Sequence, residues 1–226
     1  MNRTKLDDRT LPNYTKGEEI FNMVSHIVGG AIGIAALVLC IIMSATHGNA
    51  LGVISSIIYG VSLITLYTMS SVYHGLRPGK PKKVLQVLDH CTIYFLIAGS
   101  YTPVVLVAML PKHLVEAWIL FGVVWGCAAV AIVFTAIDFK KYSVFSMICY
   151  LAMGWCVIIF LPQTLDSMSL NGVILLVLGG IAYTIGSILY GIGKKMKYMH
   201  SVFHIFVVLG SILHFFAIIF YALPTR

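Results

Sequence analysis

Charged residues are scarce in this sequence. Of 226 residues, 15 are Lys or Arg and 8 are Asp or Glu, so charged side chains make up 10% of the chain, against about 25% in soluble domains. Hydrophobic residues reach 59% and lie in long runs separated by short polar stretches, which is typical of a polytopic helical membrane protein. The composition therefore disfavours a soluble globule, a disordered chain or a nucleic-acid-binding protein.

Cysteine is also rare. The five cysteines form no CxxC pair, and each falls in an apolar run, so we expect small buried apolar side chains rather than disulfides. They are Cys40, Cys91, Cys127, Cys149 and Cys156.

The apolar runs predict an all-α membrane protein, a bundle of seven transmembrane helices integral to the cell membrane. The expected spans are 23–44, 51–74, 84–110, 114–136, 142–162, 171–192 and 199–222. A tail of residues 1–22 precedes the helical domain of residues 23–222, and residues 223–226 form a short C-terminal tail. The N-terminal tail lacks the apolar core and cleavage site of a signal peptide. No stretch between spans is long enough for a separate soluble domain.

The cations indicate the orientation. Thirteen of them fall in the N-terminal tail and in the second, fourth and sixth loops, on one side of the membrane: Arg3, Lys5, Arg9, Lys16, Arg77, Lys80, Lys82, Lys83, Lys140, Lys141, Lys194, Lys195 and Lys197. The other side has only Lys112 and Arg226. Because positive loops stay inside, we expect a cytoplasmic N-terminus and a C-terminus outside.

Asp89 is the one acidic residue expected well inside a span, about five residues into the third. The other seven acids fall in the N-terminal tail, in loops or at a span boundary, where they can reach water. An ionisable group within the bilayer costs about 2.5 to 3.5 kcal/mol on insertion scales. Asp89 therefore needs a partner, a water-filled cavity or a function.

Three histidines share the depth of Asp89. His74 ends the second span, and His200 and His204 begin the seventh. At a rise of 1.5 Å per residue, all four residues lie within roughly 8 Å of the cytoplasmic boundary. His200 and His204 are four residues apart, so both rings lie on one helix face and could ligate one tetrahedral ion. The alternative is a hydrogen-bonded or interfacial histidine pair. Three imidazoles leaving a fourth position to water would be an open, catalytic zinc shell.

Two further side chains are candidates for catalysis at this site. Ser70 precedes His74 by four residues on the same helix face, so its hydroxyl could contact a metal-bound water or a carbonyl oxygen, or simply bond to its own helix backbone. Asp89 could hold that water, act as a general base or orient a ligating imidazole. The spacing does not separate these roles.

The remaining histidines are weaker candidates. His47 and His113 lie in outer loops and are expected to be solvated. His26, near the cytoplasmic end of the first span, could have a secondary polar role. His90 points about 100° away from Asp89 around the helix, and His214 lies some 15 Å deeper than His204. Either could belong to a hydrogen-bond network in the bundle interior, and we do not expect them to be ligands.

Three motifs occur in a recognisable order: Ser70-Ser71-Val72-Tyr73-His74, then Leu88-Asp89-His90 followed by the run from Ile97 to Pro103, then His200-Ser201-Val202-Phe203-His204. With them the chain resembles the hemolysin III family, which belongs with the progestin and adipoQ receptors (PAQR), including the adiponectin receptors, and more distantly with alkaline ceramidases. The absence of a long N-terminal region favours a bacterial-type member.

The resemblance implies a seven-helix bundle with zinc held near the cytoplasmic face by His74, His200 and His204, and with Asp89 and Ser70 close to the bound water. It also implies hydrolysis of lipid amides such as ceramide, haemolytic activity or membrane lipid homeostasis.

The leading hypothesis is therefore a zinc-dependent hydrolase acting on an acyl or amide bond of a membrane lipid. One non-enzymatic alternative is a lipid homeostasis sensor in which zinc only joins helices. The other is a pore-forming cytolysin, which should have a polar face long enough to line a channel, whereas the polar residues here cluster at one end. The sequence does not indicate the oligomeric state.

Overall fold

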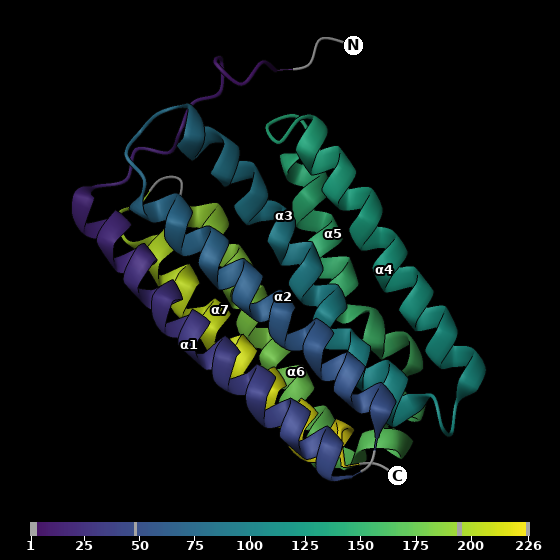
Figure 1. Cartoon of the computed structure of the whole chain (residues 1–226). Helices are drawn as coiled ribbons and strands as arrows, with labels where there is room; N and C mark the ends of the chain where they lie inside the picture. The colour runs from purple at the N-terminus through teal and green to yellow at the C-terminus, as the bar shows by residue number, and fades with distance from the viewer. Residues whose placement is uncertain (1–3, 48, 194–195, 225–226) are drawn as a thin grey trace.

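The computed structural model describes residues 4–47, 49–193 and 196–224, and every regular element among them is helical. The helices form one elongated bundle (Figure 1). In chain order they are α1 (Lys16–Thr46), α2 (Ala50–Gly75), α3 (Lys80–Pro103), η1 (Val104–Met109), α4 (Leu114–Ile137), α5 (Ser143–Trp155), η2 (Cys156–Phe160), α6 (Leu161–Gly193), α7 (Met199–Ala217) and η3 (Ile218–Ala222). The predicted all-α class is confirmed.

Six helical segments of the described chain are long and apolar enough to cross a membrane, which supports a multi-pass membrane protein. They are Lys16–Thr46, Ala50–Gly75, Lys80–Met109, Leu114–Ile137, Ser143–Gly191 and Met199–Ala222. The third is the most buried of the six, so α3 is the central helix. It continues past Pro103 as the π-helix η1, a change that fits a proline, which lacks the N–H of a regular helical turn.

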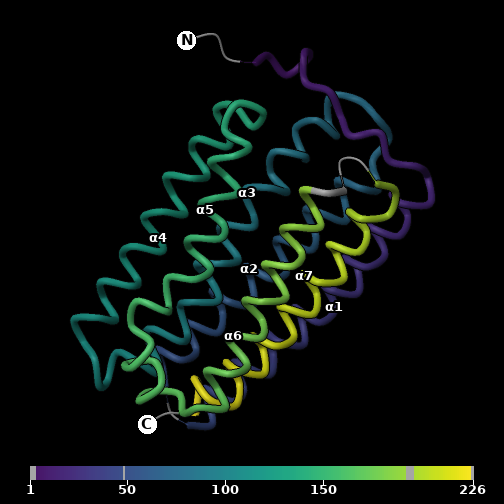
Figure 2. Tube along the Cα trace, turned by 180° about the vertical axis from the view of Figure 1, so that it is seen from behind, coloured from purple at the N-terminus to yellow at the C-terminus, as the bar shows by residue number. Residues whose placement is uncertain are grey.

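The segment Ser143–Gly191 is not one straight helix. It contains the 3-10 stretch η2, and Ser169 has a non-helical backbone with φ 64° and ψ 165°. In Figure 2 the chain descends through α5, turns at the far end of the bundle and returns through α6 beside α7. The two halves of this segment are therefore antiparallel.

Small residues let the helices pack closely. α1 lies along α2, α2 along α3, and α6 along α7. Gly60 of α2 faces Leu37 of α1, and a Cβ at Gly60 would come within 2.7 Å of the Leu37 Cα. Such contacts between backbones are how helices associate where no water drives them together.

The N-terminal segment, residues 4–15, crosses the end of the bundle at which α1 begins (Figure 1). The backbone N–H of Thr4 donates to Oδ2 of Asp138, just after α4, and Nζ of Lys83 donates to the carbonyl oxygen of Asp7. Thr15 and Glu18 then form a capping box that starts α1 at Lys16, which is earlier than the expected span start at residue 23.

The two chain ends lie at opposite ends of the bundle (Figure 1). Most of the cations counted in the sequence belong to described residues, but Arg3, Lys194, Lys195 and Arg226 lie outside them.

The five cysteines are free thiols, as expected. The expectation of burial is right for Cys40 and Cys91, only partly right for the half-buried Cys149 and Cys156, and wrong for Cys127, which is exposed on α4. An apolar thiol can face lipid there as readily as it can face the core.

Candidate metal centre

Three imidazoles from two helices meet at the end of the bundle where α1 begins. His200 and His204 lie one turn apart in α7, and His74 lies in the last turn of α2. The Nε2 atoms of His200 and His74 are 3.4 Å apart, and those of His204 and His200 are 3.1 Å apart. One ring nitrogen from each residue lies within 4.8 Å of the other two, and all three rings are buried.

Glu19 of α1 fixes the orientation of His74. The carboxylate oxygen Oε2 accepts a hydrogen bond from Nδ1 of His74 at 2.6 Å. Because a carboxylate only accepts, Nδ1 carries a proton, and in the neutral ring Nε2 is then the nitrogen with a lone pair, on the side of His200. This carboxylate–histidine arrangement is the usual support of a metal-ligating imidazole.

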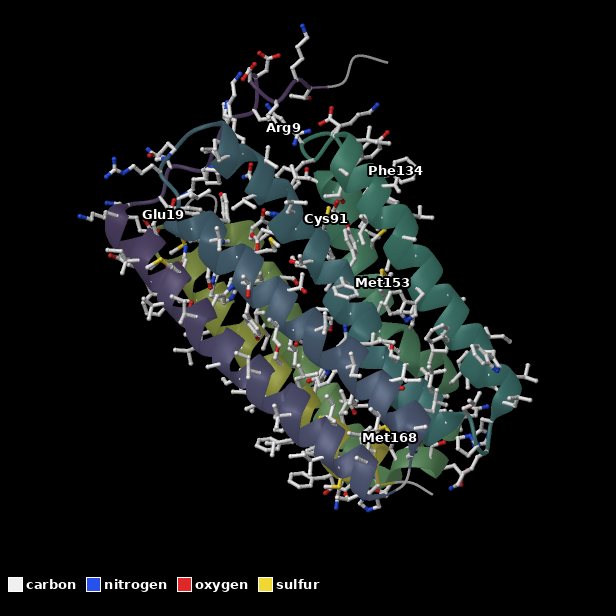
Figure 3. The ribbon with its side chains drawn as sticks, in the orientation of Figure 1. Arg9, Glu19, Cys91, Phe134, Met153 and Met168 are labelled. Carbon is white, nitrogen blue, oxygen red and sulfur yellow. The ribbon has the colours of Figure 1, made fainter. Side chains whose placement is uncertain are left out.

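Lys82 of α3 holds the other oxygen of the same carboxylate. Its Nζ donates to Oε1 of Glu19 at 2.6 Å and to the carbonyl oxygen of Leu76 at 3.0 Å. The Lys82 side chain is only 4% exposed, so its charge is compensated by Glu19 and not by water. Figure 3 places Glu19 at the same end of the bundle as Arg9.

Aromatic rings cover two of the histidines. Tyr14, from the N-terminal segment, stacks on His200 with ring centroids 4.8 Å apart and an interplanar angle of 16°. Burial raises the pKa of the Tyr14 phenol well above its ordinary value, so it stays a neutral ring. His26 of α1 stacks on His204 at 3.8 Å. These contacts limit how far the imidazoles can rotate.

Asp89 and Ser70 lie on the same cavity as the histidines of α7. The cavity measures about 150 Å³ and is bordered by Ser70, Asp89, His200 and His204 at one end. The Ser70 side chain also interacts with the Asp89 carboxylate. The structure thus brings together all five site residues predicted from the sequence, although their roles stay predictions.

Two of the three nitrogen–nitrogen distances match those around a zinc ion, and the third pair lies within 4.8 Å. Ligand nitrogens at 2.0–2.1 Å from a tetrahedral zinc lie about 3.3 to 3.4 Å from one another, close to the observed Nε2 separations of 3.4 and 3.1 Å. Neutral imidazoles are among the preferred ligands of zinc, and in the neutral His74 ring the hydrogen bond from Nδ1 to Glu19 makes Nε2 the nitrogen that can ligate.

Comparison with known proteins identifies the family. The family described as "Haemolysin-III related" matches residues 14–215. The chain belongs to this family. It is 36% identical over 208 residues to Hemolysin-3 of Bacillus cereus, covering 92% of this chain and 93% of that protein. It is 40% identical over 208 residues to the Hemolysin-3 homolog of Bacillus subtilis (strain 168), covering 92% and 96%.

A human relative connects this hemolysin III protein with the progestin and adipoQ receptor superfamily. The chain is 28% identical over 173 residues to the human Monocyte to macrophage differentiation factor, covering 73% of this chain and 69% of that protein. The resemblance expected from the three sequence motifs is therefore confirmed.

Two other histidines of this hemolysin III protein are hydrogen-bonded within the bundle, a role that the sequence left open. Nδ1 of His90 donates to the carbonyl oxygen of Gln86 at 2.8 Å, and its Nε2 accepts from the Tyr190 hydroxyl at 3.1 Å. His214 donates from Nε2 to the carbonyl oxygen of Leu176 at 3.1 Å. Neither residue belongs to the group that could hold a metal ion.

Sequence reasoning missed Glu19, Lys82 and Tyr14. Hydropathy placed Glu19 in the N-terminal tail, although helix α1 already includes it. A signal was present, because Glu19, Asn22 and His26 follow the i, i+3, i+7 spacing of one helix face. Asn22 and His26 are buried and Glu19 is partly buried, so this polar face points into the bundle.

Proposed function

We propose that this protein is a zinc-dependent intramembrane hydrolase that cleaves an acyl or amide bond of a membrane lipid. The observation that carries the proposal is that two of the three converging histidines border the same cavity as Asp89 and Ser70. Metal-ligating histidines, a carboxylate and a hydroxyl at one cavity are the parts that hydrolysis needs.

Each residue has a distinct task in this proposal. His74, His200 and His204 would hold the zinc through Nε2, with Glu19 keeping Nδ1 of His74 protonated. When bound, zinc supplies a Lewis acid that activates water and polarises a carbonyl group. Asp89 would accept the proton of the attacking water and return it to the leaving group. Ser70 would donate a hydrogen bond to the reacting oxygen.

The cavity suits a lipid substrate. Its border on α7 runs from His200 to His214, which spans about 21 Å at 1.5 Å per residue. Apart from its polar end, apolar side chains such as Ile93, Leu151 and Val207 make up much of its lining. An acyl chain could lie along this lining with its carbonyl group at the polar end.

The decisive experiment compares the purified wild-type protein with Asp89→Ala. Bound metal is quantified, and hydrolysis of a panel of lipid amides and esters, including N-acylsphingosines, is measured. We expect zinc in both proteins and turnover by the wild type only. Bound zinc with no turnover of any substrate by the wild type would overturn the hydrolase proposal.

That same outcome would favour a second function, a lipid homeostasis sensor in which zinc is structural. The specific observation behind it is that the cluster joins four helices, because Glu19 of α1, His74 of α2, Lys82 of α3 and His200 of α7 are linked by hydrogen bonds or ring contacts. Zinc could stabilise such a junction without any reaction.

A cytolysin is the third function, suggested by the names of the Bacillus relatives. A water-filled pore would need polar side chains along the whole bilayer, whereas the candidate cluster lies at one end of the bundle. Release of haemoglobin from red cells by the purified protein, unaffected by His200→Ala, would favour the cytolysin.

We also propose seven spans in the cell membrane, with the N-terminus in the cytoplasm and the C-terminus outside. The 49 residues of Ser143–Gly191 would extend about 74 Å as one helix, more than twice the hydrocarbon thickness of about 30 Å. The opposite positions of the chain ends (Figure 1) support an odd number of spans. A C-terminal tag should be accessible in intact cells and an N-terminal tag should not; the reverse labelling would overturn this orientation.

A further inference from the structure

His26 differs from the other cavity histidines outside the metal group. His90 and His214 each have a hydrogen-bond partner. His26 is only 3% exposed, yet neither Nδ1 nor Nε2 has a hydrogen-bond partner among the described residues. Since buried polar atoms are almost always hydrogen-bonded, two such atoms on one ring call for an explanation.

Ring packing holds His26 in place without using its nitrogens. One face lies against His204, at 3.8 Å between centroids and 25° between planes. The ring of Tyr67 meets it edge-on, at 5.0 Å and 82°. Gly29, one turn further along α1, leaves the room that the Tyr67 ring occupies, because a Cβ there would collide with it. The ring is therefore fixed at the border of the cavity.

The chemistry of the ring indicates what it would bind. A neutral imidazole has one N–H donor and one nitrogen acceptor, so it complements a group that both accepts and donates. A secondary amide and an alcohol hydroxyl are such groups, whereas a simple ester has only acceptors. His26 borders the same cavity as Ser70, His200 and His204, so the bound group would lie beside the reacting carbonyl.

We propose that His26 is a binding residue that recognises a hydrogen-bond donor and acceptor, an amide or a hydroxyl, in the polar part of the lipid. This inference deepens the proposed function and rests on it for the identity of the site. It makes His26 the residue that selects amide or hydroxylated lipids over simple esters.

The test uses two photoactivatable probes in lipid nanodiscs: N-dodecanoylsphingosine and dodecanoyl methyl ester, each with a diazirine in its acyl chain. Crosslinking is measured against the mole fraction of probe for the wild type, His26→Phe and His26→Gln. Phe keeps an aromatic ring against His204 but has no nitrogen, whereas Gln keeps a donor and an acceptor. Zinc content is measured in all three proteins.

We expect His26→Phe to raise the half-saturating fraction of the amide probe about tenfold, the effect of losing roughly one hydrogen bond. It should weaken binding of the ester probe less, because an ester can only accept, and leave the zinc content unchanged; His26→Gln should restore part of the amide binding. With a cleavable N-dodecanoylsphingosine, KM should rise and kcat should hold, because the contact forms before the reaction.

Unchanged amide binding by His26→Phe, or an equal loss for both probes, would overturn the inference, because a purely structural ring would not distinguish amide from ester. A wild-type protein that binds the two probes alike would overturn it as well. Selective binding of the amide probe without hydrolysis would support His26 as a binding residue and would count only against the hydrolase proposal. The failure of the His26 inference and the failure of the hydrolase proposal therefore give different results.

Discussion

His74 donates a hydrogen bond from Nδ1 to Oε2 of Glu19 across 2.6 Å, although the two residues lie 55 positions apart in the chain. This contact ties the first helix to the last turn of the second. It also determines which nitrogen of His74 is available to a metal.

Glu19→Gln is expected to weaken zinc binding by about 10- to 100-fold, the usual effect of losing the carboxylate behind a ligating histidine. Competition with a chromophoric chelator measures the affinity. Glu18→Gln is the matched control, because the adjacent Glu18 accepts from the backbone N–H groups of Thr15 and Tyr198 and does not contact His74. Equal affinities in the two variants would show that Glu19 does not support the metal.

His200→Ala and His204→Ala should each release the metal and lower the melting temperature, since the binding energy of the folded state is lost. Elemental analysis and thermal unfolding of the purified proteins check both effects. His47→Ala serves as the control, because His47 is an exposed residue just after α1 and far along that helix from the cluster. Metal contents unchanged in both cluster variants would remove these residues from the ligand set.

Acid should release the N-terminal segment. The hydrogen bond from the backbone N–H of Thr4, followed by that of Lys141, lowers the pKa of Asp138 to about 2. Because this pKa is depressed on folding, the contact stabilises the structure above the ordinary pKa near 3.8 and is lost as pH falls toward about 2. A spin label at position 10 should therefore become mobile between about pH 4 and pH 2.

Asp138→Asn provides the comparison for that experiment. An amide cannot carry the negative charge that holds the Thr4 N–H, so the label in this variant should be more mobile already at pH 7. Its mobility should then change little with acid. A label that responds to pH equally in both proteins would assign the transition to another group.

Ser169→Gly should stabilise the protein. Ser169 has φ 64° and ψ 165°, a region that glycine enters freely and that costs other residues roughly 1 to 3 kcal/mol. We expect about 1 kcal/mol more free energy of unfolding in detergent titrations. Ser167→Gly is the matched control with the opposite sign, because Ser167 is helical and donates to the carbonyl oxygen of Gln163. If Ser169→Gly unfolded more easily than the wild type, the backbone at Ser169 would not be strained.

The sequence predicted the histidine cluster because helix geometry is regular. A spacing of four residues put His200 and His204 on one face, and equal depth in the membrane put His74 and Asp89 beside them. These relationships need only the rise per residue and the span boundaries. The cavity that contains Asp89 and Ser70 agrees with that reasoning.

The residues that support the cluster were harder to predict, because hydropathy averages over about twenty residues. It set the first span boundary after Glu19, although the helix continues through it. Lys82 was counted only as a cytoplasmic charge, whereas its ammonium is buried against Glu19. The contact of Tyr14 with His200 depends on how the N-terminal segment folds back, which no local pattern encodes.

The separation of the clustered histidines along the chain has a consequence for biosynthesis. His74 and His200 are 126 positions apart, so at roughly 5 to 20 residues per second the ribosome needs about 6 to 25 seconds to reach the second after the first. During that interval Glu19 and His74 belong to an incomplete nascent chain that does not yet contain the imidazoles of α7. The cluster can close only when the final helix has entered the bundle, so its completion reports that the whole chain has been inserted.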